Sequence, residues 1–432
     1  MKGLSLLCML LCTLVDHGES ALRKRDLGVR DGCQRLHLEI LVSPLVKRGI
    51  VRRLEVQWEY APNNPGDWIG LFRSDPLENT SGKGYLAPIE KVHVTRVHGW
   101  ANTSIFEEHV EPENLGFHGR CLSYYAAYHD KLNQTLAVTC LRTEPTWMWN
   151  LREEIGSRRL RHVFIPGTHD SAAYGEYDEN VGDTRIKKYS ITQVRILFDQ
   201  MSRYWHSSFM VSRYIDLRVG YYGANNEPWW ANHGVVRIHP LRVVLKDIRE
   251  FLKNTNEIVI LDVQEFPVGF VSQDVHLSLV NLLYSELGDL AAPPLGWDST
   301  FDQVWKTNRR LIIGYDRREI VERSKFLWRP VQQKWGNVQT LNNLHSYLAG
   351  LIERPPLAMW SAMAELTPTA LDIILDRLKG LRVMAESVNH NVTEWFRRKD
   401  WQPKSNIVTV DFIRNTGIIR AAIEWNKHQG HC

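Results

Sequence analysis

The stretch Ile165-Pro166-Gly167-Thr168-His169-Asp170-Ser171 decides the fold of the larger part of this chain. An apolar run, His162-Val163-Phe164-Ile165, leads into this stretch and predicts a buried strand over 162–166. We expect this strand to stop at Pro-Gly and to deliver a His-Asp pair just beyond its end. Since an imidazole can carry protons near neutral pH, His169 is a candidate for acid–base chemistry.

Polar residues also stand at the ends of three later predicted strands. Asp216 and Arg218 alternate with apolar residues, so both side chains lie on one face of their strand. Asn232 and His233 come just before a predicted turn, and Asp411 lies within an apolar run. Each residue alone has an ordinary structural explanation, such as a loop cap or an ion pair. Their joint placement at strand ends favours a functional site.

Beyond residue 145, predicted strands alternate with segments of amphipathic helical pattern. The strands are expected at 162–166, 213–219, 228–233, 257–264, 309–316, 358–364 and 406–412. The helices are expected at 241–253, 276–287, 370–378 and 418–427. This alternation predicts an α/β fold with a parallel sheet, a distorted TIM barrel over residues 145–432. In such a barrel the carboxyl ends of the strands meet at one mouth, where the polar residues above would converge.

Residues 28–143 have a different rhythm, of short segments that alternate in period two. They predict an all-β sandwich, and a linker at Thr143–Trp149 separates it from the barrel. The segment Gly66-Asp67-Trp68-Ile69-Gly70-Leu71-Phe72 resembles small Ig-like modules of the SKICH type. No catalytic constellation stands in this region, so a packing, docking or targeting role is expected.

The amino terminus is typical of a secretory signal. Lys2 precedes an apolar core at 4–15 that is too short to span a bilayer comfortably, and cleavage is expected after Ser20, so residues 1–20 form the signal. No other segment is apolar and long enough for a membrane helix, and a secreted, extracellular protein is expected. Four sequons agree with secretion and mark a predicted glycoprotein: Asn79, Asn102, Asn133 and Asn391.

Cysteine usage points to the same compartment. Four cysteines remain after removal of the signal, and they allow three pairings. Cys121 and Cys140 flank a hairpin-like segment, so a disulfide between them is favoured. A long-range bridge between Cys33 and Cys432 stays open. The net charge of +4 is small for 432 residues and gives no reason to expect a nucleic-acid partner.

Two histidines, several acids and an arginine suit metal-free cleavage of a phosphodiester. One imidazole would remove a proton from an attacking hydroxyl, and the other would give a proton to the leaving oxygen. The guanidinium of Arg218 would offset charge on the phosphorus centre. A metal site was weighed as an alternative, but Arg218 would repel a cation there, and no spacing of Cys or His indicates zinc.

Residues 145–432 resemble the phosphatidylinositol-specific phospholipase C X-domain family, and in particular the PI-PLC X domain-containing proteins. The motif Gly167-Thr168-His169-Asp170-Ser171, a following Ile-Asp-Leu-Arg and a later Asn-His-Gly carry the resemblance. It implies a distorted TIM barrel and attack by the inositol 2-hydroxyl, which yields a cyclic inositol phosphodiester and releases the lipid alcohol.

The resemblance also implies roles for the matched residues. His169 would be the general base, oriented by Asp411, and His233 the general acid, paired with Asp170. Asp170 and Arg218 match the metal-independent bacterial members, whereas calcium-dependent members carry Asn and an acidic ligand there. The resemblance therefore implies no metal and no other cofactor.

The chain departs from the family pattern at Gln264, where bacterial members carry Lys and calcium-dependent members carry Glu. Gln264, Asn232, Arg317 and Glu386 are the candidate substrate-binding residues. The expected substrate is an inositol phospholipid or a glycosylphosphatidylinositol-type lipid at a membrane surface. Trp335 is one of several tryptophans that could form a rim at that surface or pack in the core.

Two alternatives remain open from the sequence. The barrel could be catalytically impaired and serve as a lipid- or protein-binding module. The uncharged Gln264, at a position where the family carries a charged residue, supports this alternative. A phosphodiesterase of the glycerophosphodiester type is also conceivable, but such enzymes need clustered acids and a metal.

Overall fold

The computed structural model describes residues 35–45, 53–78, 86–107, 116–175, 185–194 and 212–428. The predicted signal peptide, Cys33, Cys432 and Asn79 lie outside the described residues. The chain divides into two compact units, within which these residues fall. The first comprises Met1–Glu39, Trp58–Gly99 and Tyr124–Cys140, and the second Ile40–Gln57, Trp100–Ser123 and Leu141–Cys432.

Seven strands precede the barrel and form two sheets, with the strand orders β1-β2-β5 and β4-β3-β6-β7. Their bounds are β1 His37–Val42, β2 Arg53–Glu59, β3 Trp68–Phe72, β4 Glu90–His93, β5 Gly99–Phe106, β6 Arg120–His129 and β7 Thr135–Thr143. β3 is antiparallel to both β4 and β6. The region is thus built of strands, as predicted, while a two-layered sandwich stays a prediction. Cys121 and Cys140 are both disulfide-bonded, as expected.

Parallel strands form the sheet of the barrel, in the order β16-β15-β14-β11-β8-β19-β18-β17. Their bounds are β8 Ile165–Thr168, β11 Tyr214–Tyr221, β14 Val259–Val268, β15 Leu311–Tyr315, β16 Leu327–Trp328, β17 Gln332–Trp335, β18 Trp360–Met363 and β19 Ile407–Val410. An antiparallel hairpin, β12 (Trp229–His233) and β13 (Val236–Pro240), extends from β11. Within residues 212–428, β16 and β17 do not pair with one another, so the sheet curls as an incomplete barrel.

The first predicted strand is wrong in its bounds. A 3-10 turn occupies Leu160–His162, and β8 runs through the Pro-Gly pair rather than ending there. Gly167 is needed because β8 lies between two close neighbours, β11 and β19. A Cβ atom on Gly167 would come within 2.7 Å of the Thr409 hydroxyl and 2.9 Å of the Tyr214 ring. Glycine here lets β19 and β11 approach β8 closely. The motif therefore determines the packing of the sheet as well as the point at which the chain leaves β8.

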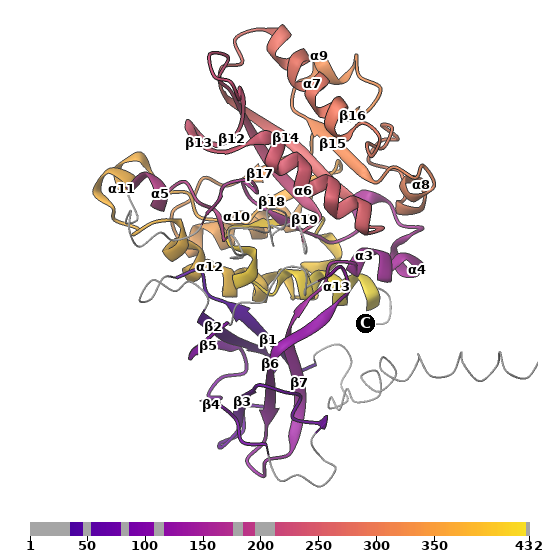
Figure 1. Ribbon diagram of the computed structural model, residues 1–432. Helices are drawn as coiled ribbons and strands as arrows, with labels where there is room; N and C mark the ends of the chain where they lie inside the picture. The colour runs from indigo at the N-terminus through magenta and orange to yellow at the C-terminus, as the bar shows by residue number, and fades with distance from the viewer. Residues whose placement is uncertain are drawn as a thin grey trace, which may run out of the picture. The chain divides into compact units, whose positions relative to one another are not determined.

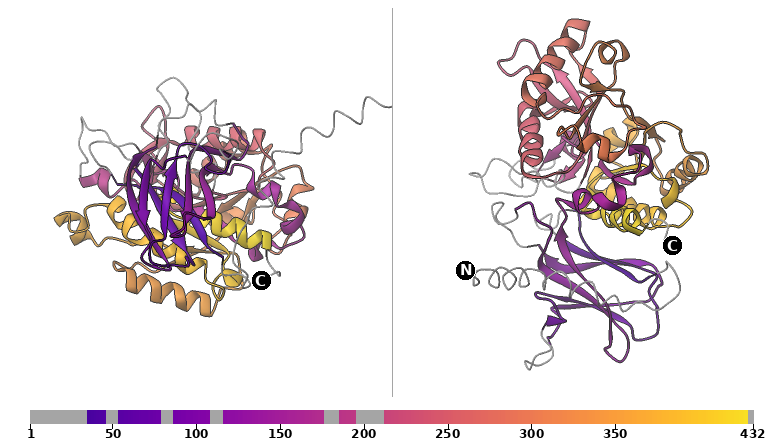
Figure 2. Two further views of the ribbon diagram at one scale, coloured as in Figure 1. Left: turned by 90° about the horizontal axis from the view of Figure 1, so that it is seen from below. Right: turned by 90° about the vertical axis from the view of Figure 1, so that its right-hand side faces the viewer.

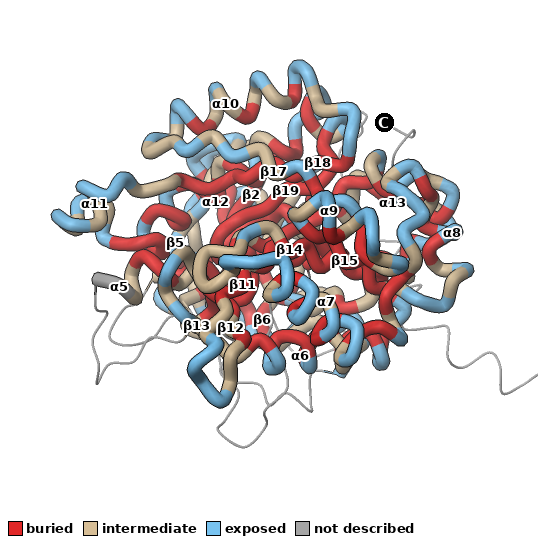
Figure 3. Tube along the Cα trace, turned by 90° about the horizontal axis from the view of Figure 1, so that it is seen from above, coloured by how far each residue is buried: buried red, intermediate tan, exposed pale blue. Residues whose placement is uncertain are grey.

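Amphipathic helices cover the outside of this sheet (Figures 1 and 2). The longer ones are α6 Leu241–Asn254, α7 Gln273–Leu287, α10 Leu341–Glu353, α12 Leu381–Phe396 and α13 Ile418–His428. In α6 the apolar positions Leu241, Val244, Leu245, Ile248 and Leu252 are all buried, as their spacing predicts. Figure 3 shows the same division, with buried strands in the middle and helices whose outer sides are exposed.

Short elements complete the unit: α3 Trp147–Asn150, α4 Arg152–Ile155, β9 Tyr174–Gly175, α5 Arg185–Lys188, β10 Gln193–Val194, α8 Phe301–Trp305, α9 Arg318–Val321 and α11 Ala370–Leu375. The predicted helix 370–378 is too long, because Asp376 adopts a left-handed backbone with φ of 50° and ends α11. None of the helices in the described part of the chain combines the length and apolar character needed to cross a bilayer.

A buried ion pair fixes the amino-terminal side of the sheet. Arg213 Nε lies 2.6 Å from Glu257 Oε2, and both side chains are fully buried. Arg213 also donates to the carbonyl of Pro145, while Glu257 accepts from the backbone amides of Met148 and Trp149. The predicted linker is therefore held against the starts of β11 and β14 by satisfied, buried charges.

Candidate active site

The carboxyl ends of four strands bring the predicted catalytic residues together. His169 and Asp170 follow β8, Asp216 and Arg218 lie on β11, His233 ends β12 and Asp411 follows β19. β19, β8 and β11 are adjacent and parallel, so their carboxyl ends share one edge. This is the edge at which barrel enzymes build their sites.

His169 is held between a carboxylate and a guanidinium. Its Nδ1 lies 2.8 Å from Asp411 Oδ1, and its Nε2 lies 2.9 Å from Arg218 Nη2. Because arginine only donates, Nε2 must carry a lone pair, so the ring is neutral and donates its Nδ1–H to Asp411. Burial lowers the pKa of His169, but the charges of Glu365 and Asp411 outweigh it and raise the pKa to about 10. Arg218 works in the opposite direction and lowers the pKa of His169, and its N–H occupies the lone pair of Nε2. The ring can therefore take up a proton at Nε2 only when Arg218 moves away.

Arg218 lies at the centre of a ring of acids. Its guanidinium is 3.5 Å from Asp216 Oδ2, 3.7 Å from Asp170 Oδ2 and 3.5 Å from Glu265 Oε2. Burial works against its charge, but these carboxylates outweigh burial and raise the pKa of Arg218 further above its ordinary value. Arg218 is therefore a permanent, mostly buried cation, well suited to a phosphate.

His233 and Asp170 form the opposite side of the site. His233 Nε2 lies 3.9 Å from Asp170 Oδ2. Burial, with Arg218 and His169 nearby, lowers the pKa of His233 to about 3, so its ring is neutral in the free site. Burial raises the pKa of Asp170 to about 8, against the influence of Arg218. Near neutral pH the proton shared by this pair therefore resides on Asp170, whose Oδ2 lies 3.9 Å from His233 Nε2.

The two imidazoles face each other across a narrow space. Their ring centroids are 6.3 Å apart, with an interplanar angle of 88°. Arg218 contacts His169 directly and Asp170 beside His233, so the cation lies next to both sides of that space. A group of phosphate size placed there would meet a base, a cation and an acid.

Backbone geometry holds this arrangement in place. Asp170 adopts a left-handed backbone with φ of 37°, which turns the chain sharply after His169. The amide of Asp170 donates to Asp216 Oδ2 at 2.9 Å, and Gln193 Nε2 donates to the carbonyls of His169 and Val410. Strain at the turn is thus supported by hydrogen bonds from two neighbouring segments.

Glu365 is a site residue that the sequence reasoning missed. It follows β18 and is buried, and its charge raises the pKa of His169 more than that of Asp411 does. Burial raises the pKa of Glu365 itself to about 8. Neither carboxylate oxygen has a hydrogen-bond partner among the described residues. The signal was present in the sequence, since Glu365 is an acid just past an apolar strand, as Asp411 is.

A β-bulge explains the position of Gln264. The pairing of β11 with β14 shifts between Leu217 and Arg218, so that Arg218 lies opposite Glu265 instead of Gln264. The Gln264 amide donates to Asp262 Oδ2 and, at 2.9 Å, to the carbonyl of Val331. Gln264 thus serves a buried network beside the site, and Glu265 supplies the charged group that faces Arg218.

The other predicted contact residues lie elsewhere. Asn232 is buried and donates to the Tyr222 hydroxyl at 2.8 Å. Arg317 follows β15 and contacts Asp316 and the ring of Phe266. Glu386 lies on α12 and contacts Ser43, away from the two histidines. The structure therefore gathers the predicted catalytic residues and leaves Arg317 and Glu386 outside their cluster.

The predicted sugar acceptors and rim tryptophan are accessible to different extents. Asn102 and Asn133 are exposed, while Asn391 is half-buried on α12. Trp335 is exposed at the end of β17, and its indole donates to Thr367 at 2.8 Å. Glycosylation and a role in membrane contact stay predictions.

The curled parallel sheet, with a His–His–Arg cluster at its carboxyl edge, defines an incomplete α/β barrel. Named relatives agree with this class. Human PI-PLC X domain-containing protein 1 is 25% identical over 322 residues, which cover 68% of this chain and 96% of that protein. PI-PLC X domain-containing protein 3 of Mus musculus is 26% identical over 302 residues, or 65% of this chain and 92% of that protein. The chain is a relative of the PI-PLC X domain-containing proteins, which confirms the resemblance.

No family model matches the chain. Among solved structures, a pentafluoro-Phe-containing phosphatidylinositol-specific phospholipase C from Staphylococcus aureus covers 65% of this chain and 96% of its own, with 12% identity and a TM-score of 0.49. A second structure of that phospholipase C gives 12% identity and a TM-score of 0.48, with 65% and 97% covered. Structural similarities this distant do not strengthen the sequence similarity to the PI-PLC X domain-containing proteins.

Proposed function

We propose that this protein is a secreted, metal-independent phosphodiesterase of phospholipase C type that cleaves phosphatidylinositol or a related inositol glycolipid. The single observation that carries the proposal is the facing pair His169 and His233, with Arg218 bonded to the first. The relation to PI-PLC X domain-containing proteins supports an inositol phospholipid as the substrate class.

His169 acts as the general base in this mechanism. The inositol 2-hydroxyl takes the place of the Arg218 N–H at Nε2 and gives its proton to that nitrogen. The oxygen then attacks phosphorus, while Asp411 stabilises the imidazolium through the hydrogen bond at Nδ1. Arg218, released from His169, turns to the phosphate oxygens and offsets the charge that grows there.

His233 acts as the general acid, supplied by Asp170. Asp170 holds a proton near neutral pH, because burial raises its pKa to about 8, and it lies 3.9 Å from His233 Nε2. A bound phosphodiester anion favours the proton on the imidazole, which passes it to the oxygen of the departing lipid alcohol. The products are a cyclic inositol phosphodiester and the lipid alcohol.

Arg218 also bears on metal independence. Any cation between Asp170, Asp216 and Glu265 would compete with a guanidinium already within 3.7 Å of all three carboxylates. The fixed charge of Arg218 supplies the electrostatic role that a metal ion has in other phosphodiesterases.

The test uses the full-length protein, phosphatidylinositol vesicles and EDTA. Inositol cyclic phosphate should form, as followed by phosphorus NMR, and its formation should stop in His169→Ala and His233→Ala. His118→Ala is the matched control, since His118 is exposed and distant in sequence from the cluster. Folded protein that binds the vesicles without turnover would instead support a binding module. Loss of turnover in EDTA that added calcium restores would support a metal-dependent phosphodiesterase.

A further inference from the structure

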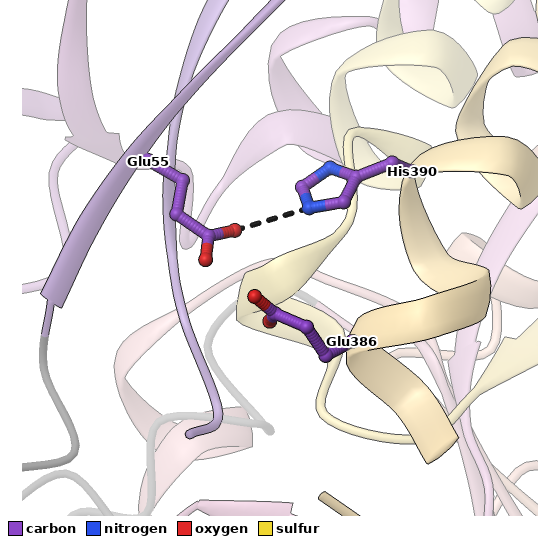
Figure 4. Close-up of side chains that lie close together, drawn as sticks. All are labelled: Glu55, Glu386 and His390. Carbon is purple, nitrogen blue, oxygen red and sulfur yellow. Dashed lines mark ion pairs between the residues drawn. The ribbon is translucent and has the colours of Figure 1, made fainter. Parts of the chain in front are cut away.

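A second cluster of ionisable side chains lies apart from the two catalytic histidines. Glu55 of β2 meets Glu386 and His390 of α12, and all three side chains are buried (Figure 4). One ligand atom from each lies within 4.8 Å of the others. Among the described residues, no other His, Cys, Asp and Glu side chains gather at least three such atoms.

Secondary structure places these groups toward one another. Glu386 and His390 are four residues apart on α12, so both project from one face of the helix. Glu55 and Gln57 are two apart on β2 and likewise share a face. A helix face with a carboxylate and an imidazole thus meets a strand face with a carboxylate and an amide.

The amide of Gln57 fixes the tautomer of His390. Gln57 Nε2 donates to the carbonyl of His390 at 3.1 Å, which leaves Gln57 Oε1 to face His390 Nδ1 at 3.3 Å. His390 Nδ1 must therefore carry the hydrogen, and Nε2 keeps its lone pair. Trp100 stacks on the ring at 4.3 Å and holds its plane.

The lone pair of His390 points at a carboxylate. Nε2 lies 3.1 Å from Glu55 Oε2 but has no hydrogen-bond partner within the described part of the chain, and the residue is 97% buried, since its relative exposure is 3%. Glu386 Oε1 and Glu55 Oε1 likewise receive no hydrogen bond from the described residues. Three electron-pair donors thus converge on one point, which is costly unless a cation or protons lie between them.

The surroundings orient the donors without neutralising them. Asn415 Nδ2 donates to Glu55 Oε2 at 2.7 Å, and Ser43 Oγ donates to Glu386 Oε2 at 3.2 Å. Arg53 is a positive side chain near the acids, and its Nη2 lies 4.0 Å from Glu55 Oε1. Hydrogen bonds that aim carboxylates and imidazoles in this way are typical of the shell around a metal ion.

We propose that Glu55, Glu386 and His390 form a structural binding site for a divalent transition-metal ion of the zinc type. An imidazole with two carboxylates suits zinc, whereas calcium and magnesium prefer ligand sets made only of oxygen. Two carboxylates neutralise the ion, and a water completes the tetrahedron.

The observed spacing is close to what such an ion needs. Two ligands bound to tetrahedral zinc at ordinary bond lengths lie about 3.3 Å apart. His390 Nε2 and Glu55 Oε2 are already at 3.1 Å. A carboxylate oxygen of Glu386 lies within 4.8 Å of a ligand atom of each of the other two residues.

The ion would also support the catalytic acid Asp411. Asn415, which binds Glu55, accepts from Asn389 at 3.4 Å, and Asn389 donates to the carbonyl of Asp411 at 3.0 Å. The site would therefore stabilise the position of Asp411, which orients His169. Its own residues have no direct part in the reaction.

Metal content of tag-free, full-length protein tests the proposal. About one zinc ion per chain is expected after dialysis against zinc, as measured by mass spectrometry of the metal. The catalytic variant His169→Ala should keep the ion. His390→Ala and the nearly isosteric Glu386→Gln should lose it by about tenfold or more at equal zinc concentration. After EDTA treatment, zinc but not magnesium should raise the midpoint of thermal unfolding.

The reading is overturned if wild-type protein and Glu386→Gln bind equal zinc and zinc leaves the unfolding midpoint unchanged. The two glutamates would then share a proton in place of an ion. Cobalt provides a second measurement if a variant folds poorly, since an intense visible absorption in the wild type reports tetrahedral coordination. None of these readouts uses turnover, so the result is independent of whether the barrel is an active phosphodiesterase.

Discussion

The hydrogen bond between Asp411 and His169 offers the sharpest test of the proposed chemistry. Asp411→Asn keeps the size and shape of the side chain, and its Oδ1 can still accept the Nδ1–H of His169. The substitution therefore removes a charge and leaves the neutral tautomer of the ring in place. Any loss of rate measures how far Asp411 stabilises the imidazolium that forms in the reaction.

The structure sets the size of that loss. Nδ1 and Oδ1 are 2.8 Å apart, and the two side chains are only 12% and 5% exposed. Unit charges centred about 4 Å apart attract by about 4 kcal/mol at an effective permittivity of about 20. With about half of the imidazolium charge developed in the transition state, the loss is about 2 kcal/mol, or about 30-fold in kcat. A charge-assisted hydrogen bond of about 1.5–3 kcal/mol gives the same range.

The assay follows release of inositol cyclic phosphate from phosphatidylinositol in mixed micelles, with kcat and KM measured separately. We expect kcat to fall and KM to change little, because the bond strengthens only as charge develops. Asp298→Asn is the matched control, since Asp298 is 72% exposed and pairs with Arg161. Asp411→Asn with more than half of the wild-type kcat, while His169→Ala is inactive, would refute the stabilising role.

Three further outcomes are expected. Arg218→Lys should lower kcat by about 10²–10³-fold, because an ammonium cannot hold the phosphate with a planar fork; an unchanged kcat would remove Arg218 from the mechanism. Glu365→Gln removes the carboxylate that most raises the pKa of His169, so the acid limb of the kcat/KM–pH profile should move to lower pH; a limb that stays in place would contradict the role of Glu365. Arg213→Met leaves Glu257 buried without its partner and should cost about 3–5 kcal/mol in urea unfolding, with partial recovery in the double variant Arg213→Met/Glu257→Gln; an equal loss in both would contradict the ion-pair explanation.

Periodicity predicted the parts of the fold in which burial repeats with the element. The strands β11, β14, β15 and β19 and the helix α6 fall close to their expected ranges because each has a continuous apolar face. β8 was misplaced, since its Pro-Gly pair signals a turn locally, while the tight packing of its neighbours requires Gly167 within the strand. Short strands such as β16 and β17 have too few residues to show any period.

The catalytic cluster could be predicted because each member follows or lies in an apolar strand. Glu365 met the same rule and was overlooked, whereas the β-bulge that sets Glu265 opposite Arg218 has no signal in the chain. The pairing of Glu55 with Glu386 and His390 joins residues more than 300 positions apart, and only the folded structure brings them together.

Among the described strands, β16 and β17 each pair on one side only, so the barrel has two open sheet edges. Such edges can recruit strands from other molecules and start aggregation. This chain limits the danger at both edges. β16 has two residues, Pro330 without an N–H follows it, and Lys334 places a charge on β17. Val331 lies between β16 and β17 in the chain. Its backbone amide donates a hydrogen bond to Asp262 Oδ2 at 3.2 Å, so it does not offer itself to another strand. An incomplete barrel can thus keep its two edges from pairing with strands of other molecules.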